Sequence, residues 1–154
     1  MPRTLETRIP PPVVLLFAAC LMWGLARLSP ALRLAWPGAA WLAATLATLG
    51  LALNLVPKWR FGRAGTTVNP LRPQAARQLV VTGPYRFSRN PMYLGHVLLL
   101  LAWACGLGHP LAPVGVVFYM AWVTCFQIRP EERVLARRFP DAYRDYRRRV
   151  RRWL

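Results

Sequence analysis

Apolar residues are gathered into four runs, and the segments between these runs carry almost all of the charges. The runs cover residues 12–28, 34–56, 91–107 and 111–128. Arg27 is the one charged residue inside them. A helix needs roughly 17 to 25 apolar residues to cross a bilayer, and each run reaches that length. The pattern therefore predicts an all-α fold, an integral membrane four-helix bundle formed by a single domain.

The first run is marginal in length and follows Arg3 and Arg8, so a cleaved signal peptide is the alternative interpretation. Bulky Met22 and Trp23 stand late in this run, and no small-x-small cleavage site follows them. We therefore expect a spanning helix. Only three residues, Gly108 to Pro110, separate the third and fourth runs, which predicts a tight antiparallel hairpin.

The segment after the last run, residues 129–154, has a helical period of its own. Apolar and aromatic side chains recur there every three or four residues, at Leu135, Phe139, Tyr143, Tyr146, Val150 and Trp153. Arginines fill the other faces, and Pro140 should divide the segment into two short helices. We expect this amphipathic, cytoplasmic segment to lie along an anionic inner leaflet or to pack under the bundle.

The chain has 21 Lys and Arg against 5 Asp and Glu, which gives a net charge of +16. The N-terminal segment, the first, second and third loops and the tail hold 2, 2, 7, 0 and 10 of the 21 basic residues. Arg27, at the end of the first run, is counted with the first loop. Basic loops stay in the cytoplasm, so the second loop and the tail should both lie there, with both termini inside. A nucleic-acid partner is not expected, because a soluble basic domain would spread its arginines over its helices. The predicted partners are an anionic bilayer and a lipidic small molecule, and a bacterial inner membrane is the expected location.

Two segments at predicted cytoplasmic helix ends combine polar groups. The first extends from Gly83 to Gly95, where a Gly-Pro turn precedes two arginines, two tyrosines and the Asn90-Pro91 pair. Asn90 and Pro91 suit the cap and the first position of a helix. A helix N-terminus flanked by arginine and tyrosine can also hold an anionic group such as a carboxylate.

The second segment is Arg129-Pro130-Glu131-Glu132, at the exit of the fourth run. Acidic residues in a first helical turn suit the helix dipole, which is a purely structural explanation. However, two of only five acidic residues stand together here. A carboxylate at this place could hold ribose hydroxyls, an amine or a cationic sulfonium. The three cysteines are isolated in apolar runs, so no metal site is expected.

An ordered set of motifs resembles the isoprenylcysteine carboxyl methyltransferase family, which belongs with the wider phospholipid methyltransferases. The motifs are Gly65–Thr67, Leu79–Tyr85, Arg89-Asn90-Pro91-x-Tyr93, Glu131-Glu132-x-x-Leu135 and Phe139-Pro140-x-x-Tyr143-x-x-Tyr146. The resemblance implies an integral membrane methyltransferase that uses S-adenosyl-L-methionine and releases S-adenosyl-L-homocysteine. The implied cofactor-binding residues are Gln78, Leu79, Val80, Tyr85, Arg89, Asn90, Pro91, Met92, Tyr93 and Glu131.

The resemblance also implies an arginine near the last glutamates that contacts the substrate, and Arg129 is the nearest candidate although its spacing does not match cleanly. Asn90 stands where the family often has histidine, so this position should not act as a titrating base. A carboxylate acceptor needs no base, whereas an amine must lose a proton, and Glu132 would be its acceptor. His96, inside the third run, is either a functional group or a histidine hydrogen-bonded between helices.

Carboxyl O-methylation of an isoprenylcysteine-like acid is the leading prediction, with phospholipid or amine N-methylation as the alternative. A non-catalytic membrane module that binds anionic lipid, and a small transporter, stay open as other classes. Transport is disfavoured because the runs contain almost no ionisable residues that could line a path. The sequence leaves the methyl acceptor and the oligomeric state undetermined.

Overall fold

The structure is a computed structural model that describes the backbone of residues 6–63 and 79–154, and the side chains of residues 6–57 and 79–154. Within these ranges every regular element is helical. The α-helices are α1 (Pro11–Leu28), α2 (Ala39–Arg63), α3 (Pro91–Leu107), α4 (Pro113–Val123), α5 (Arg129–Arg138) and α6 (Pro140–Arg149). A π-helix, η5 (Thr124–Ile128), joins α4 to α5, and short 3₁₀ turns occupy Pro30–Leu32 and Gly83–Arg86. The predicted all-helical fold is therefore confirmed for the described part of the chain.

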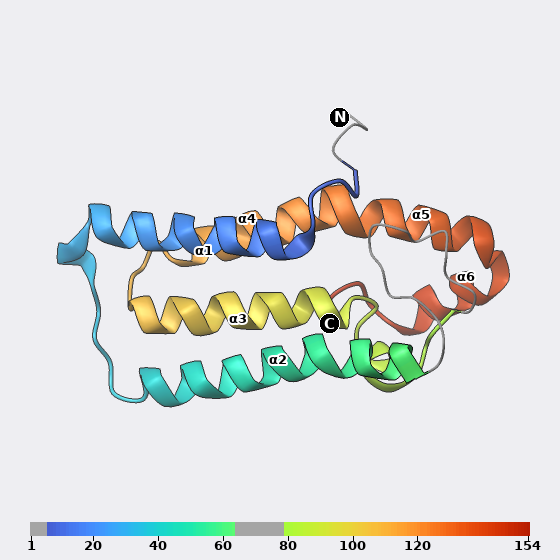
Figure 1. Ribbon diagram of the computed structural model, residues 1–154, viewed down its shortest axis with the longest axis horizontal. Helices are drawn as coiled ribbons and strands as arrows, with labels where there is room; N and C mark the ends of the chain where they lie inside the picture. The colour runs from blue at the N-terminus through green and yellow to red at the C-terminus, as the bar shows by residue number, and fades with distance from the viewer. Residues whose placement is uncertain (1–5, 64–78) are drawn as a thin grey trace.

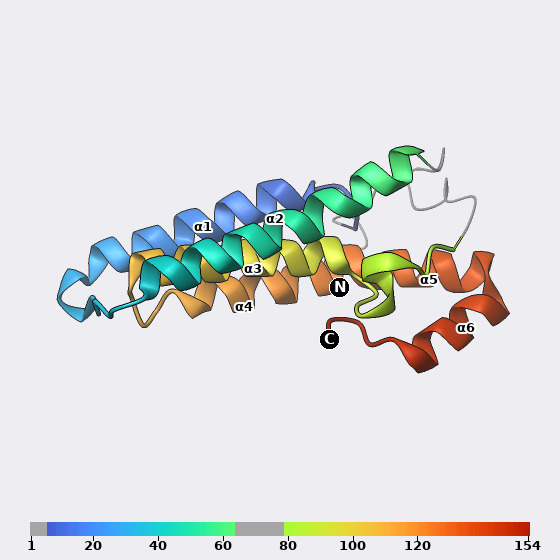
Figure 2. The same ribbon diagram turned by 90° about the horizontal axis from the view of Figure 1, so that it is seen from below.

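Helices α1 to α4 lie side by side along the long axis of the molecule (Figure 1). Helix α5 continues the direction of α4 beyond the end of this bundle, and α6 turns back beneath it (Figure 2). Phe139 separates α5 from α6 and Pro140 begins α6, as predicted, because proline cannot continue the backbone hydrogen bonds of a preceding helix. The C-terminus returns to the start of α3, so the two polar segments singled out in the sequence occupy the same end of the molecule.

Helix α2 differs from the predicted run at both ends. It begins at Ala39, after Gly38, whose φ of 90° ends any helix that would start at residue 34. The preceding chain is held instead by the N–H of Leu34, which donates to the carbonyl of Gly108 at 2.6 Å. At its other end the helix continues past the predicted limit at residue 56 and contains Pro57.

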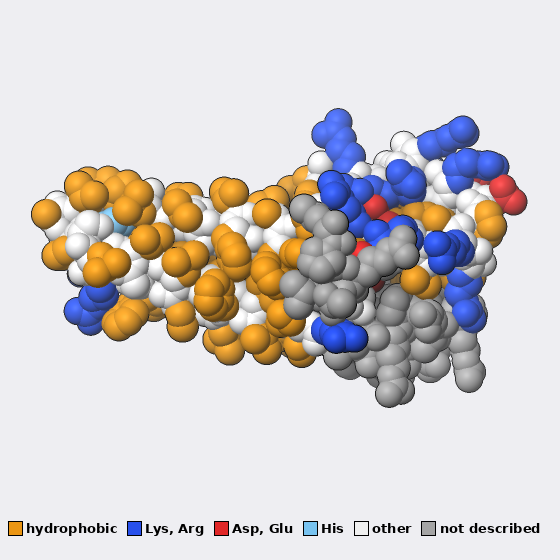
Figure 3. Space-filling model, turned by 90° about the horizontal axis from the view of Figure 1, so that it is seen from above, with side chains coloured by type: hydrophobic (Ala, Val, Ile, Leu, Met, Phe, Trp, Pro, Cys, Tyr) orange, Lys and Arg blue, Asp and Glu red, His pale blue; other side chains and the backbone are white. Residues whose placement is uncertain are grey.

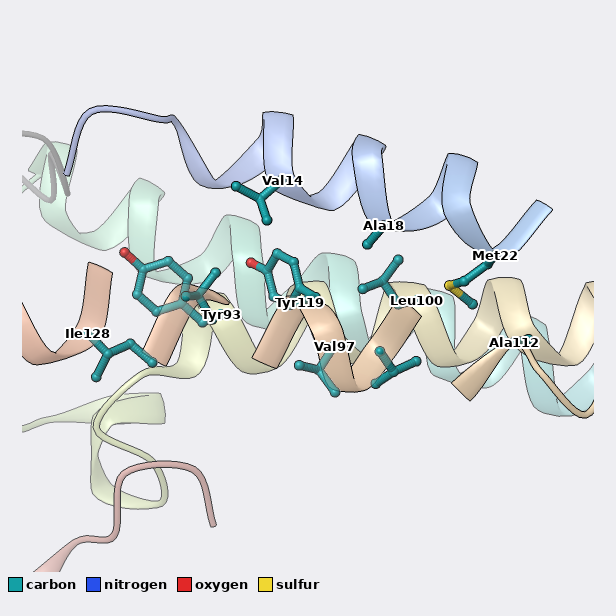
Figure 4. Packing of buried hydrophobic residues seen from close by; sticks show 11 residues of the cluster. Val14, Ala18, Met22, Tyr93, Val97, Leu100, Ala112, Tyr119 and Ile128 are labelled. Carbon is teal, nitrogen blue, oxygen red and sulfur yellow. The ribbon is translucent and has the colours of Figure 1, made fainter. Parts of the chain in front are cut away.

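The buried core lies between α1, α3 and α4. One stripe of α1 faces inward, formed by Val14, Ala18 and Met22 at intervals of four residues. Helices α3 and α4 contribute mainly Val97, Leu100, Val116, Tyr119 and Val123, and Figure 4 shows several of these side chains meeting the α1 stripe. The core is thus a narrow seam rather than a wide interior.

Helix α2 packs against α3 through two glycines. A Cβ atom added at Gly95 would lie 2.6 Å from the carbonyl oxygen of Gly50, and one added at Gly50 would lie 2.8 Å from the carbonyl oxygen of Gly95. Small residues of this kind let helix backbones approach closely, as in membrane helix pairs. The crossing brings Asn54 of α2 beside the first turns of α3.

Apolar side chains cover the outside of the bundle, as Figure 3 shows, whereas Lys and Arg side chains gather mainly at the end that holds α5 and α6. Trp41 is 82% exposed, and Phe17 and Leu55 are each more than half exposed. An exposed apolar surface of this extent marks contact with lipid or protein. In the described part, α1 and the Ala39–Pro57 portion of α2 are long and apolar enough to cross a membrane, and α3 is apolar but shorter.

Candidate functional site

The start of α3 and the start of α5 meet at one end of the bundle. The hydroxyl of Tyr93, in the first turn of α3, donates to the carboxylate of Glu131, in the first turn of α5, at 2.7 Å. Tyr93 is buried, and Figure 4 shows its hydroxyl directed toward the end of the bundle where Ile128 lies. The two segments that the sequence singled out, 38 residues apart, therefore form one polar site.

Glu131 has an unusual electrostatic environment for a carboxyl group. Burial raises its pKa to about 7, the Tyr93 hydrogen bond opposes this rise, and the negative charge of Glu132 adds to it. The group therefore changes protonation near neutral pH, where carboxyl groups are usually fully ionised. A cationic ligand beside it would favour the ionised form.

Glu132 points to a different set of partners. Arg152 holds both of its carboxylate oxygens, through Nε at 3.1 Å and Nη2 at 2.7 Å, and Arg89 Nη2 lies 3.1 Å from one of them. The side chains of Arg89 and Glu132 are 10% and 13% exposed. Hydrogen bonding to Glu132 raises the pKa of Arg152. Glu132 is thus the centre of a three-residue ion-pair cluster, and its role as a base stays a prediction.

Arg89 also has unused hydrogen-bonding capacity. Its Nε and Nη1 atoms are buried and have no hydrogen-bond partner within the part of the chain that the structure describes. Buried donors without partners are rare in proteins and call for an explanation such as a missing ligand. Two arginines against one carboxylate also leave this cluster with an excess positive charge.

The last residues of the tail are fastened to the loop before α3. The backbone N–H of Arg89 donates to the carbonyl of Arg151 at 3.0 Å, and the Asn90 amide donates to the carbonyl of Arg152 at 3.0 Å. Ser88 Oγ, fully enclosed, donates to the same carbonyl at 3.3 Å. The position of Asn90 in the sequence suggested that its side chain caps α3. It forms no capping hydrogen bond, because its amide group is bound to the tail.

The turn Gly83–Arg86 brings Tyr85 toward this site. Gly83 has a φ of 62°, which a residue with a side chain adopts only under strain. The hydroxyl of Tyr146, on α6, donates to the carbonyl of Tyr85 at 2.7 Å. Burial raises the pKa of Tyr85 well above its usual value, with further contributions from the negative forms of Tyr146 and Glu131.

The remaining predicted site residues lie around these contacts. Pro91 is buried, and Leu79, Val80 and Met92 are partly buried on the approach to α3 and in its first turn. Gln78 lies outside the described residues. Arg129 is exposed, and it forms no ion pair with the residues that the structure describes.

A buried polar chain connects three helices behind the site. Asn54 Nδ2 and His96 Nε2 are hydrogen-bonded at 2.9 Å, and His96 Nδ1 is hydrogen-bonded to the Tyr119 hydroxyl at 2.6 Å. His96 is thus a histidine hydrogen-bonded between helices, one of the two predicted interpretations. Asn54 and Gln127, near the ends of the second and fourth apolar runs, are both buried, and Gln127 donates to the carbonyl of Ile9 at 2.7 Å.

Sequence reasoning missed Arg152 and Tyr146 as parts of the site. Both belong to an amphipathic segment in which arginines and aromatic residues repeat at helical spacing. Their pattern indicates only which face is polar. A scarce acidic residue such as Glu132, surrounded in sequence by many arginines, was the one available signal that some arginine would be bound internally.

The sequence model of the phospholipid methyltransferase family matches residues 39–142. The chain is 48% identical over 63 residues to an uncharacterized protein from Haemophilus influenzae, across 41% of this chain and all of that protein. It is 36% identical over 76 residues to the Delta(14)-sterol reductase of Mus musculus, across 48% of this chain and only 18% of the reductase. No solved structure matches. The matched residues include α3, α5 and both halves of the polar site, and the chain belongs to the phospholipid methyltransferase family.

Proposed function

We propose that the protein is an integral membrane methyltransferase that uses S-adenosyl-L-methionine to methylate a lipidic or hydrophobic acceptor at the inner leaflet. Membership of a membrane methyltransferase family supports the reaction class. The observation that carries the proposal is the Tyr93–Glu131 contact, because it joins the two segments implied to hold the cofactor. The proposed topology, four spans with both termini in the cytoplasm, rests on the distribution of basic residues.

The residues at this end of the bundle fit a cofactor that carries both a sulfonium cation and a carboxylate. Glu131, with a pKa of about 7, would become ionised beside a cation or would accept hydrogen bonds from ribose hydroxyls. The start of α3 and the unused donors of Arg89 offer partners for an anionic group. When bound, S-adenosyl-L-methionine supplies an electrophilic methyl group.

The chain's own residues contribute mainly position and shielding from water. Tyr93 holds the carboxylate of Glu131 in one orientation, and the Gly83–Arg86 turn carries Tyr85, whose carbonyl accepts from the Tyr146 hydroxyl. Glu132 fastens the tail to the loop before α3, which fixes the start of that helix. An acceptor would approach from the inner leaflet, between the helices.

A carboxylate is the proposed acceptor, as in isoprenylcysteine-like acids, and exposed Arg129 would orient it. Amine N-methylation is the second candidate, and one observation favours it. Glu131 changes protonation near neutral pH, so it could take the proton that an amine must lose. Under this alternative Glu131 replaces Glu132 as the base, because Glu132 is bound to two arginines.

Binding of S-adenosyl-L-homocysteine and S-adenosyl-L-methionine to purified protein in lipid nanodiscs tests the proposal. We expect Glu131→Ala and Tyr93→Ala to weaken binding by about tenfold or more, since each removes a hydrogen bond to or within the site. Asp141→Asn, on an exposed residue of α6, is the matched control and should bind normally. Failure of the unmodified protein to bind either compound would leave the non-catalytic module as the better description.

The acceptor is found by incubating the protein with a methyl-labelled cofactor and a lipid extract. A methyl ester releases labelled methanol in base, whereas a methylated amine keeps its label. Arg129→Ala should reduce ester formation and leave cofactor binding nearly unchanged. Collapse of cofactor binding in this variant would show that Arg129 does not act on the acceptor.

A further inference from the structure

A cavity lies between α5 and α6, away from the Tyr93–Glu131 contact. It has a volume of about 300 Å³ and is lined by Ala136, Pro140, Tyr143, Arg144, Arg147 and Arg148. Three of these six residues are arginines, and none is acidic. The cavity belongs to the end of the molecule where Figure 3 shows basic side chains gathered, beyond the apolar part of the bundle.

The cationic groups of the cavity are only partly neutralised. Arg144 pairs with Asp141 at 2.8 Å, and this pair is largely exposed. The Arg147 guanidinium lies over the ring of Tyr143, 6.0 Å from its centroid, which orients the group without changing its charge. Arg148 forms no ion pair within the described residues.

Glu132, on α5, does not line the cavity. Glu132 is bound by Arg89 and Arg152, so it does not balance the arginines that line the cavity. The lining residue Tyr143 is only 2% exposed: burial raises its pKa to about 12, Glu132 adds to the rise, and Arg89 and Arg147 oppose it. A second ring, that of Tyr146, packs against it with centroids 6.3 Å apart. The aromatic part of the cavity wall is therefore Tyr143, which packs against Tyr146 on one side and carries the Arg147 guanidinium over its ring.

We propose that this cavity binds a phosphate group, held by Arg147 and Arg148 with Arg144 at the rim. Guanidinium groups present several donors in a planar fork that matches phosphate oxygens, and a phosphate can accept from more than one fork at once. A phosphate alone is much smaller than about 300 Å³. The space leaves room for the alcohol to which the phosphate is esterified, either the glycerol of an anionic lipid or a soluble organic phosphate.

Two double variants with equal changes in charge test the site. Arg147→Gln with Arg148→Gln removes two lining residues, whereas Arg149→Gln with Arg151→Gln removes two arginines that do not line the cavity. The first arm titrates the full-length protein with glycerol 3-phosphate by calorimetry. We expect the cavity variant to bind about tenfold or more weakly than the unmodified protein, and the control to bind within about twofold.

The second arm compares thermal unfolding in vesicles of phosphatidylglycerol and of phosphatidylcholine, whose choline cation would face the arginines. Stabilisation by phosphatidylglycerol that is kept in the control and lost in the cavity variant identifies a lipid headgroup as the ligand. Binding of glycerol 3-phosphate without this lipid effect identifies a soluble phosphate. Equal losses in both double variants, or no binding in either arm, overturn the proposal. If the double variant does not fold, Arg148→Gln replaces it and is judged by the same outcomes.

Discussion

The ion pairs of Glu132 offer a direct test of how the tail is attached to the bundle. Glu132→Gln keeps the shape of the side chain and removes the charge that faces Arg89 and Arg152. Arg89 is only 10% exposed, so its guanidinium would be left without a counter-charge in a largely dry environment. Removing one partner of a buried ion pair costs about 3–5 kcal/mol.

Arg89 dominates this cost. Arg152 is 32% exposed, so water can solvate it after the substitution, and its share should be about 0–1 kcal/mol. The tail and the loop before α3 also keep their backbone contacts, which places the total near the lower limit, at about 3 kcal/mol. For a chain of this size that corresponds to a fall in the unfolding temperature of roughly 6–12 °C.

Thermal unfolding of the purified protein in one lipid composition measures the effect. Asp141→Asn is the matched control, because its pair with Arg144 is exposed and should contribute about 0–1 kcal/mol. A second variant, Glu132→Gln with Arg89→Met, removes the isolated charge and should recover most of the lost stability. Equal shifts for Glu132→Gln and Asp141→Asn, or no recovery in the double variant, would refute the reasoning.

Four further predictions concern the site and the helix contacts. Cofactor binding should strengthen as pH rises through about 7, because the ionised form of Glu131 attracts a cation, and calorimetry at several pH values measures this. Without ligand, the same raised pKa should lower the unfolding temperature as pH rises from 4.5 to about 7, and Glu131→Gln should abolish that slope. Gly95→Ala should cost about 1–3 kcal/mol, because its Cβ would lie 2.6 Å from a backbone oxygen of α2, whereas Gly106→Ala, with open space around it, should be neutral in thermal unfolding. Tyr119→Phe removes the hydrogen bond between the Tyr119 hydroxyl and His96 Nδ1 and should cost about 0.5–1.5 kcal/mol by the same assay.

Most of the helical architecture could be predicted from the distribution of charge. The four runs, with Arg27 as their one charged residue, correspond to α1, α2, α3 and α4 with η5, and Pro140 marked the division of the tail. The start of α2 could not be predicted in this way, because residues 34–38 are as apolar as the helix that follows. What excludes them from the helix is the backbone conformation of Gly38 and the bond from Leu34 to Gly108, a contact between distant segments.

The site was predictable as a pair of segments but not as a set of contacts. Scarcity of acids, helix-start chemistry and the family resemblance indicated both segments, and the Tyr93–Glu131 bond joins them. The selection of Arg152 from the tail could not be predicted. Ten arginines follow the last apolar run, and nothing local distinguishes the one whose side chain faces Glu132.

The two adjacent glutamates illustrate why neighbouring residues can serve different purposes. Consecutive positions on an α-helix point about 100° apart, so α5 directs Glu131 toward α3 and Glu132 toward the loop and the tail. Two arginines hold the Glu132 side chain in place, and its negative charge adds to the rise that burial causes in the pKa of Glu131. The residue that fastens the tail therefore also adjusts the carboxyl group proposed to meet the cofactor. Because Glu131 and Glu132 are adjacent on α5, attachment of the tail at Glu132 is coupled to the protonation of Glu131.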